Sequence, residues 1–450
     1  MRTPVIVLPS YPWRGLARAT PGDALDLLSR SAPVDPFALW HPHDLLAVGA
    51  AGEGTATTAL TPNRITHQAT SIPAHRWLRS LPLYVGFAAS GIGVALPGAT
   101  LPALLLRWRL NDVQAGELFL FAWIGSSFGS LAIHGSLRSC LVFGCALVSA
   151  GGAGLAFASG SHIQANLWMA AFGAGLGMTM TSISLLRRQQ AERTGTELIR
   201  LNFIWALGAC LCPTLAERAL RVGDLRPLLG GLATLFALLA LWTAGQHRLA
   251  ACRADTRDAW TWAAIRKVPL PLVLMIMLIT GIEASAGGWL GAYSRRSGAG
   301  LAATIAAPTC LWAGLLLSRL LWVPGSRRIR PPHSIRGSVL VMAAGAALLV
   351  ARSGGWSLGA AAFLLGVGLG PIYPMLLAAV LQFTRTGGIF FLAGVGAACL
   401  PWLTGLVAAA HGSLRAGLLV PVGATLLLLA LAWITPSRTL AASAPGEESA

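Results

Sequence analysis

Twelve apolar stretches restrict what this 450-residue chain can fold into more than any other feature. As a helix, about twenty apolar residues span the hydrocarbon core of a bilayer. The stretches cover residues 81–106, 113–133, 138–159, 165–186, 201–218, 226–245, 269–293, 299–323, 337–353, 357–383, 387–410 and 415–435. A helix satisfies its own backbone hydrogen bonds, which lipid cannot do. The sequence therefore predicts an all-α integral membrane protein with twelve transmembrane helices.

The charge content agrees with this prediction. Only 11% of the residues are charged and 55% are hydrophobic, whereas a soluble domain has about 25% charged residues. The formal net charge of +17 comes from arginines in the short gaps between the apolar stretches. Arginines in such gaps set the topology and face lipid headgroups, so nucleic acid is not expected as a partner.

The basic residues also predict the orientation of the chain. With the N-terminus in the cytoplasm, the inner loops hold fifteen Arg and Lys residues and the outer loops hold nine. The positive-inside rule then places both termini in the cytoplasm. We expect a multi-pass protein of the plasma (inner) membrane, monomeric and surrounded by membrane lipid.

Polar segments divide the chain into five parts. Residues 1–80 contain no run of spanning length and no signal-peptide pattern, so we expect either a disordered extension or a start codon placed too early. Residues 81–245 are expected to form one six-helix bundle and residues 269–435 a second. A cytoplasmic central loop, 246–268, separates them, and residues 436–450 are expected to be a disordered tail.

The two halves share short motifs in the same order. The motif Gly173-Ala-Gly-Leu-Gly177 matches Gly366-Val-Gly-Leu-Gly370, and Gly208-Ala-Cys-Leu-Cys-Pro213 matches Gly396-Ala-Ala-Cys-Leu-Pro401. Both matches pair one span with the span six positions later. Two related six-helix bundles that rock about a site near the membrane midplane are typical of secondary transporters.

Longer motifs resemble the major facilitator superfamily and, within it, the fucose permease-like branch. They are Gly91-Ile-Gly-Val-Ala-Leu-Pro97 with Asn111-Asp-Val-Gln-Ala-Gly116, the stretch from Gly281 through Glu283 and Trp289 to Tyr293, and Gly368-Leu-Gly-Pro-Ile-Tyr-Pro374. The resemblance covers residues 81–435. It implies two pseudo-symmetric six-helix bundles and alternating-access transport of a small polar solute, foremost a sugar.

The loop after the second span departs from the pattern of that superfamily. The usual loop reads G-x-L-x-D-R-x-G-R-R, whereas here Gly129-Ser-Leu-Ala-Ile133-His134-Gly-Ser-Leu-Arg138 has an isoleucine at the aspartate position. The resemblance implies that this loop latches the two conformations, so we expect a latch that is weaker or built differently. Arg138 and Arg319, which lies at the equivalent position of the second half, are the candidate gating residues.

One carboxylate, Glu283, lies in the middle of the apolar span 269–293. Acids inside a membrane are costly, and they usually face a cavity, pair with a partner or carry a proton. Ala286 and Gly287, one turn further on, leave room for a ligand or a partner helix. We expect Glu283 to couple transport to protons. The alternative is a neutral Glu bonded to a backbone group of a bent helix.

Six further residues are candidates for the solute cavity: Asn202, Trp205, Thr179, Tyr373, Trp289 and Gln382. Asn202 and Trp205 are three residues apart and therefore share a helix face. An amide beside an aromatic ring is a common sugar-binding pair. Taken singly, however, helix packing or a hydrogen bond between helices explains such a residue better than contact with a ligand does.

Other classes of function find less support. A membrane-embedded transferase would need paired carboxylates or a metal or phosphate motif, and the sequence has no HExxH, no Gly-rich loop ending in GK[ST] and no acidic cluster beside a span. The seven cysteines show no zinc-site spacing. We therefore expect no enzyme activity, no metal and no cofactor. Efflux of drugs or metabolites, and a non-transporting sensor, are the alternatives to solute–proton symport.

Overall fold

The computed structural model describes residues 74–158, 161–190, 194–254, 262–298, 301–325, 331–351, 355–380, 382–383 and 388–440. Its long helices are α2 (Ala74–Arg107), α3 (Asp112–Leu131), α4 (Leu137–Phe157), α5 (His162–Gln190), α6 (Thr194–Val222), α7 (Arg226–Ala244), α9 (Leu270–Arg296), α10 (Leu301–Gly325), α11 (Pro331–Ala351), α12 (Gly355–Val380), α13 (Gly388–Ala410) and α15 (Leu419–Ile434). The short helical segments are η2 (His247–Ala251), α8 (Trp262–Ile265), α14 (Leu414–Gly417) and α16 (Ser437–Leu440). Most of the expected N-terminal extension and residues 441–450 of the expected tail lie outside the described residues.

Each predicted span corresponds to one of the twelve long helices, which confirms the predicted fold class. Ten helical segments of the described chain are long and apolar enough to cross a membrane. The other two spans are α3 and α10. In α3, a Cβ at Gly125 or Gly129 would meet the backbone of α5 at Ala170 or Ala174. Small residues are therefore needed at these two positions, where α3 packs directly on α5.

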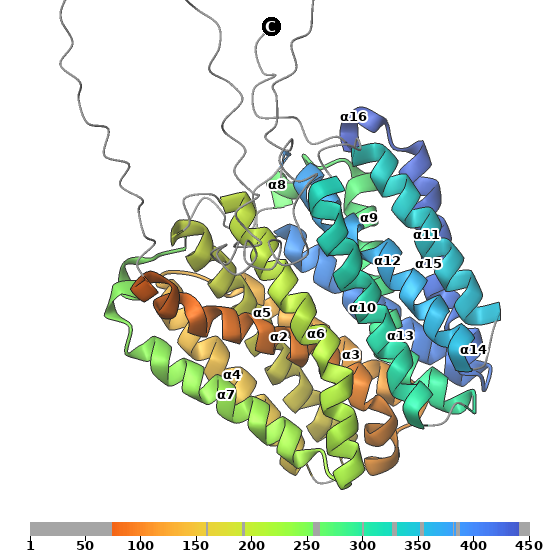
Figure 1. The fold of residues 1–450 in the computed structure, drawn as a ribbon, viewed down its shortest axis with the longest axis horizontal. Coiled ribbons are helices and arrows are strands. Elements are labelled where there is room, and N and C mark those ends of the chain that lie inside the picture. Colours follow the sequence, from red (N-terminus) through yellow and green to blue (C-terminus); the bar gives the residue numbers. More distant parts are fainter. Residues whose placement is uncertain are drawn as a thin grey trace, which may run out of the picture. The chain divides into compact units, whose positions relative to one another are not determined.

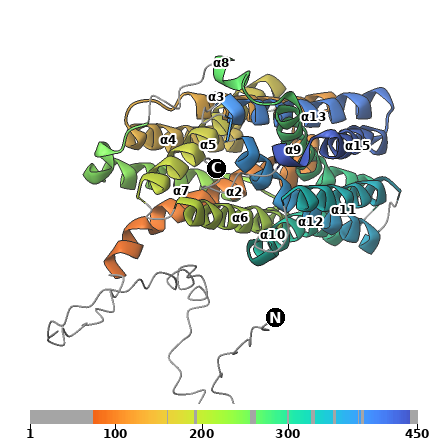
Figure 2. The ribbon, with the colours of Figure 1, turned by 90° about the horizontal axis from the view of Figure 1, so that it is seen from above.

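The long helices form two bundles that lie side by side, α2 to α7 and α9 to α15 (Figure 1 and Figure 2). In the first bundle α3 and α4 both pack on α5, α4 also packs on α7, and α2 packs on α6. In the second bundle α10 and α11 both pack on α12, α11 also packs on α15, and α9 packs on α13. Each pair of the second bundle is a pair of the first moved six spans along the chain, so the two bundles repeat one packing scheme.

The repeated glycines make equivalent contacts in the two bundles. A Cβ at Gly173 would meet the backbone of α3, and a Cβ at Gly366 would meet the backbone of α10, the corresponding helix. In the same way, a Cβ at Gly208 would meet the backbone of α2, and one at Gly396 that of α9. Small residues are needed where helix backbones touch directly. The two halves therefore share these glycine motifs because the same close helix contacts occur in both bundles.

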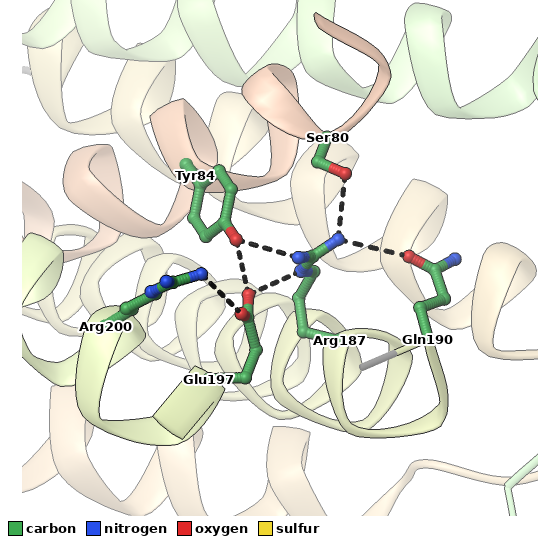
Figure 3. Close-up of polar contacts among 6 residues, drawn as sticks. All are labelled: Ser80, Tyr84, Arg187, Gln190, Glu197 and Arg200. Atoms are coloured by element: carbon green, nitrogen blue, oxygen red, sulfur yellow. Dashed lines mark hydrogen bonds and ion pairs between the residues drawn. The ribbon is translucent and has the colours of Figure 1, made fainter. Parts of the chain in front are cut away.

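A polar cluster ties three helices together at the end of the first bundle where α2 begins (Figure 3). Glu197 of α6 accepts hydrogen bonds from the Tyr84 hydroxyl at 2.5 Å and from Nε of Arg187 at 2.7 Å. The Arg187 guanidinium also donates to the Tyr84 hydroxyl at 2.7 Å and to the Ser80 hydroxyl at 2.8 Å. Arg200 lies 3.8 Å from the same carboxylate. The cluster holds α2, α5 and α6 in one arrangement.

We expect Glu197→Gln to lower the free energy of unfolding by about 3–5 kcal/mol, because it leaves a buried guanidinium without its counter-charge. The Arg187 and Glu197 side chains are only 12% and 6% exposed. Thermal unfolding of the detergent-solubilised protein measures the loss. The control is Glu217→Gln, whose partner Arg221 is 67% exposed, and which should change stability by about 0–1 kcal/mol. Equal losses in the two variants would contradict a stabilising role for the cluster.

Candidate functional site

Glu283 lies in the middle of α9, close to the positive charge of Arg319. It is partly buried and interacts electrostatically with Arg319 of α10. Tyr373 of α12 interacts electrostatically with both residues. All three helices belong to the second bundle, so an acid, a base and a phenol from three of its spans come close together. The neighbouring positive charge offsets part of the cost of placing a carboxylate within an apolar span.

Arg319 connects this group to the first bundle. Its Nε donates a hydrogen bond to the Gly370 carbonyl of α12 at 3.2 Å. Its guanidinium carbon lies 5.4 Å from the ring centroid of Trp205, which belongs to α6 of the other bundle. A cation over an aromatic face is attracted by the ring quadrupole. The contact therefore joins the two bundles through one cationic side chain.

A second tryptophan completes the group. The rings of Trp205 and Trp312 meet edge to face, with centroids 5.8 Å apart and planes at 82°. We refer to Glu283, Arg319, Tyr373, Trp205 and Trp312 as the central cluster. It draws on α6 of the first bundle and on α9, α10 and α12 of the second.

Trp312 of α10 fills the space beside the small residue Gly287, where we expected either a ligand or a partner helix. A Cβ at Gly287, one turn after Glu283, would lie 2.9 Å from the Trp312 ring. The small residue therefore serves a partner helix at this position. Trp312 carries no distinguishing mark in the sequence, and the signal that points to it is Gly287, the glycine that it packs against.

The central cluster contains four of the residues that the sequence indicated, Glu283, Arg319, Tyr373 and Trp205. Arg319 was expected to act as a gating residue and instead lies within the cluster itself. Trp289 lies apart: it is fully buried, and its Nε1 donates to the Pro401 carbonyl at 2.9 Å. Thr179 is also buried, and its hydroxyl lies 3.7 Å from the sulfur of Cys145 between α4 and α5. Asn202, one turn before Trp205, is exposed, and Gln382 lies exposed in the turn after α12.

Arg138 lies in the first turn of α4, directly after the loop that joins α3 to α4, and its side chain bonds to the end of α7. Its Nε donates to the Thr243 carbonyl at 3.2 Å, and its guanidinium also donates to the Ala244 carbonyl, at the end of α7. The same loop pairs with the central loop through backbone hydrogen bonds, Leu137 N–H to the Cys252 carbonyl and Ala254 N–H to the Gly135 carbonyl. The loop that departs from the superfamily pattern is thus anchored largely by main-chain atoms.

The two bundles also touch in the second halves of α2 and α9. A Cβ at Gly98 of α2 would meet the backbone of α9 at Gly287 and Gly288. At the end of α9, the Arg296 guanidinium donates to the Asp112 carboxylate at 2.5 and 2.8 Å, which joins α9 to the start of α3. Direct backbone contact of this kind requires that the bundles be closed at this level.

The sequence matches no protein-family profile and no curated protein sequence. Its structure, however, resembles solved membrane transporters. A bacterial homolog of the human lysosomal transporter Spinster, in an inward-facing and unoccupied conformation, aligns with a TM-score of 0.63 at 13% identity over 82% of this chain and 98% of the other. The chain has the major facilitator fold.

Two more structures with this fold align over most of their length. A D-xylose–proton symporter aligns with a TM-score of 0.60 at 14% identity, over 81% of this chain and 99% of the other. The E. coli fucose:proton symporter aligns with a TM-score of 0.54 at 16% identity, over 78% of this chain and 97% of the other. The major facilitator fold that the sequence motifs indicated is therefore confirmed, and the central cluster lies where its two bundles meet.

Proposed function

We propose that the chain is a secondary active transporter that carries a small polar solute, foremost a sugar, by alternating access and in symport with protons. The observation that supports this best is the central cluster, which joins an acid and a base of one bundle to a tryptophan of the other. In transporters built from repeated bundles, the bundles rock about a midplane site. A ligand between Arg319 and Trp205 would be released or held as they separate or close.

In this proposal four members of the central cluster have a direct role in transport. Glu283 carries the proton. Arg319 supplies the positive charge that stabilises the Glu283 carboxylate after the proton has been released. The rings of Trp205 and Trp312 cover the apolar face of the solute. The partners are the solute, protons and membrane lipid, and the working unit is a monomer of the plasma membrane with both termini in the cytoplasm. Two of the similar structures are sugar–proton symporters, which favours the same chemistry here.

Uptake into proteoliposomes that contain the full chain tests the proposal. With the inside alkaline, at least one labelled solute from a panel of sugars, sugar acids and other polar metabolites should accumulate, because protons flowing inward drive symport. A protonophore should remove the accumulation, and liposomes without protein should show none. If no solute of the panel enters or exchanges, the transport proposal is wrong, and efflux of apolar compounds or a sensor role becomes the better explanation.

A further inference from the structure

Two hydrogen-bond donors of the central cluster are buried without an acceptor. Among the described residues, neither Nη1 of Arg319 nor Nε1 of Trp205 has a partner. The two side chains come from opposite bundles and are in cation–π contact. A buried donor without an acceptor costs free energy, and a charged one costs more. Folded proteins leave few such groups, and those that exist call for an explanation such as a ligand.

Glu283 does not satisfy the Arg319 guanidinium. The two residues interact electrostatically, yet no ion pair within 4.0 Å joins them among the residues that the structure describes. The Nε donor is already used on the Gly370 carbonyl. Nη1 is therefore the donor of Arg319 that is left to bind something else.

The chemistry of these donors selects a carboxylate. The two oxygens of a carboxylate can accept hydrogen bonds from two donors, here Nη1 of Arg319 and Nε1 of Trp205, and its negative charge matches the guanidinium. The hydroxyls of a neutral sugar match these donors less well, since they carry no charge and each hydroxyl also needs an acceptor for its own hydrogen. A phosphate dianion would bring more negative charge than one arginine can balance. The rings of Trp205, Trp312 and Tyr373 suit a compact organic body attached to the anionic group.

We propose that the central cluster binds its solute through a carboxylate held by Arg319 and Trp205, so that the cargo is an acidic sugar or a similar small hydroxylated carboxylate. This inference rests on the proposed transport function and narrows it. The titratable groups that interact electrostatically with Arg319 are Glu283 and Tyr373. Because a second negative charge beside the Glu283 carboxylate would be repelled, the anion enters with the proton that neutralises Glu283. One monoanion and one proton then cross together, and no net charge moves.

Matched pairs of solutes test the inference on the intact protein. Glucuronate and galacturonate differ from glucose and galactose by a carboxylate in place of a CH₂OH group. In proteoliposomes with the inside alkaline, the acids should enter at least about tenfold faster than the neutral sugars. Glucuronate, but not glucose, should also raise the thermal unfolding temperature of the purified wild-type protein, because a ligand stabilises the state that it binds.

Substitutions at Arg319 connect the preference to this residue. Arg319→Gln should lose the preference for the acids, whereas Arg319→Lys, which keeps the charge without the guanidinium, should retain part of it. Preferred entry of neutral sugars, or an unchanged preference in folded Arg319→Gln, would overturn the carboxylate proposal and leave proton-coupled transport standing. Preferred binding of inorganic phosphate or a phosphate ester would also overturn it. If no solute moves in any direction, the transport function and this inference fail together.

Discussion

Glu283→Gln should abolish accumulation of the solute against its gradient and leave exchange of solute across the membrane intact. The amide has nearly the shape of the carboxyl group but cannot take up and release a proton, so the carrier would cycle only with solute bound. A pH difference of one unit can drive about tenfold accumulation when one proton accompanies each solute. The ratio of internal to external solute should therefore fall from about ten to about one.

The matched control for this variant is Glu117→Gln. Glu117 is also an acid within a span, but it lies in α3 of the first bundle, where it accepts a hydrogen bond from Asn166 at 3.4 Å. Its loss should leave accumulation close to that of the wild type. Accumulation by Glu283→Gln at the wild-type level would remove Glu283 from the coupling mechanism. Loss of exchange together with accumulation would make Glu283 a binding residue instead.

Gly98→Leu should slow transport by about tenfold or more. The backbones of α2 and α9 touch at Gly98 and Gly287, so a side chain at Gly98 must force the bundles apart at this level. Overpacking costs about 1–3 kcal/mol, and each 1.4 kcal/mol shifts an equilibrium by about tenfold. The closed arrangement at this end would become rare, and a carrier that cannot close one end cannot complete its cycle.

Initial rates of exchange, measured beside thermal unfolding, check this second prediction. Gly231→Leu is the control, because a Cβ at Gly231 of α7 would meet nothing within 4 Å. The control should transport at the wild-type rate. Gly98→Leu should remain folded while its exchange falls. Normal exchange by folded Gly98→Leu would show that closure at α2 and α9 is not part of the cycle.

The sequence predicted the spans and the position of the acid well because both are local features. An apolar run of sufficient length is a helix in lipid regardless of its neighbours, and Glu283 stands out as the acid of its span. The repeated glycines also predicted the repeated packing, since close helix contact demands small residues. These features need no knowledge of how helices are rotated against one another.

The partners of Glu283 were not predictable in the same way. The helices are apolar nearly all round, so the pattern of residues along α9 or α10 does not mark which face meets a neighbour. Arg319 stood beside a loop in the sequence, and only the packing of α10 brings it into the electrostatic field of Glu283 and onto Trp205. Trp289 and Thr179 have the same residue types as a binding site, yet their polar atoms face Pro401 and Cys145.

Recording pH outside weakly buffered proteoliposomes while solute is added tests the central claim most directly. If Glu283 carries a proton with each solute molecule, addition of the transported solute should turn the external medium alkaline. Glu283→Gln should give no pH change although labelled solute still exchanges. Entry of labelled solute through the wild-type protein without any alkaline shift would contradict proton symport through the central cluster.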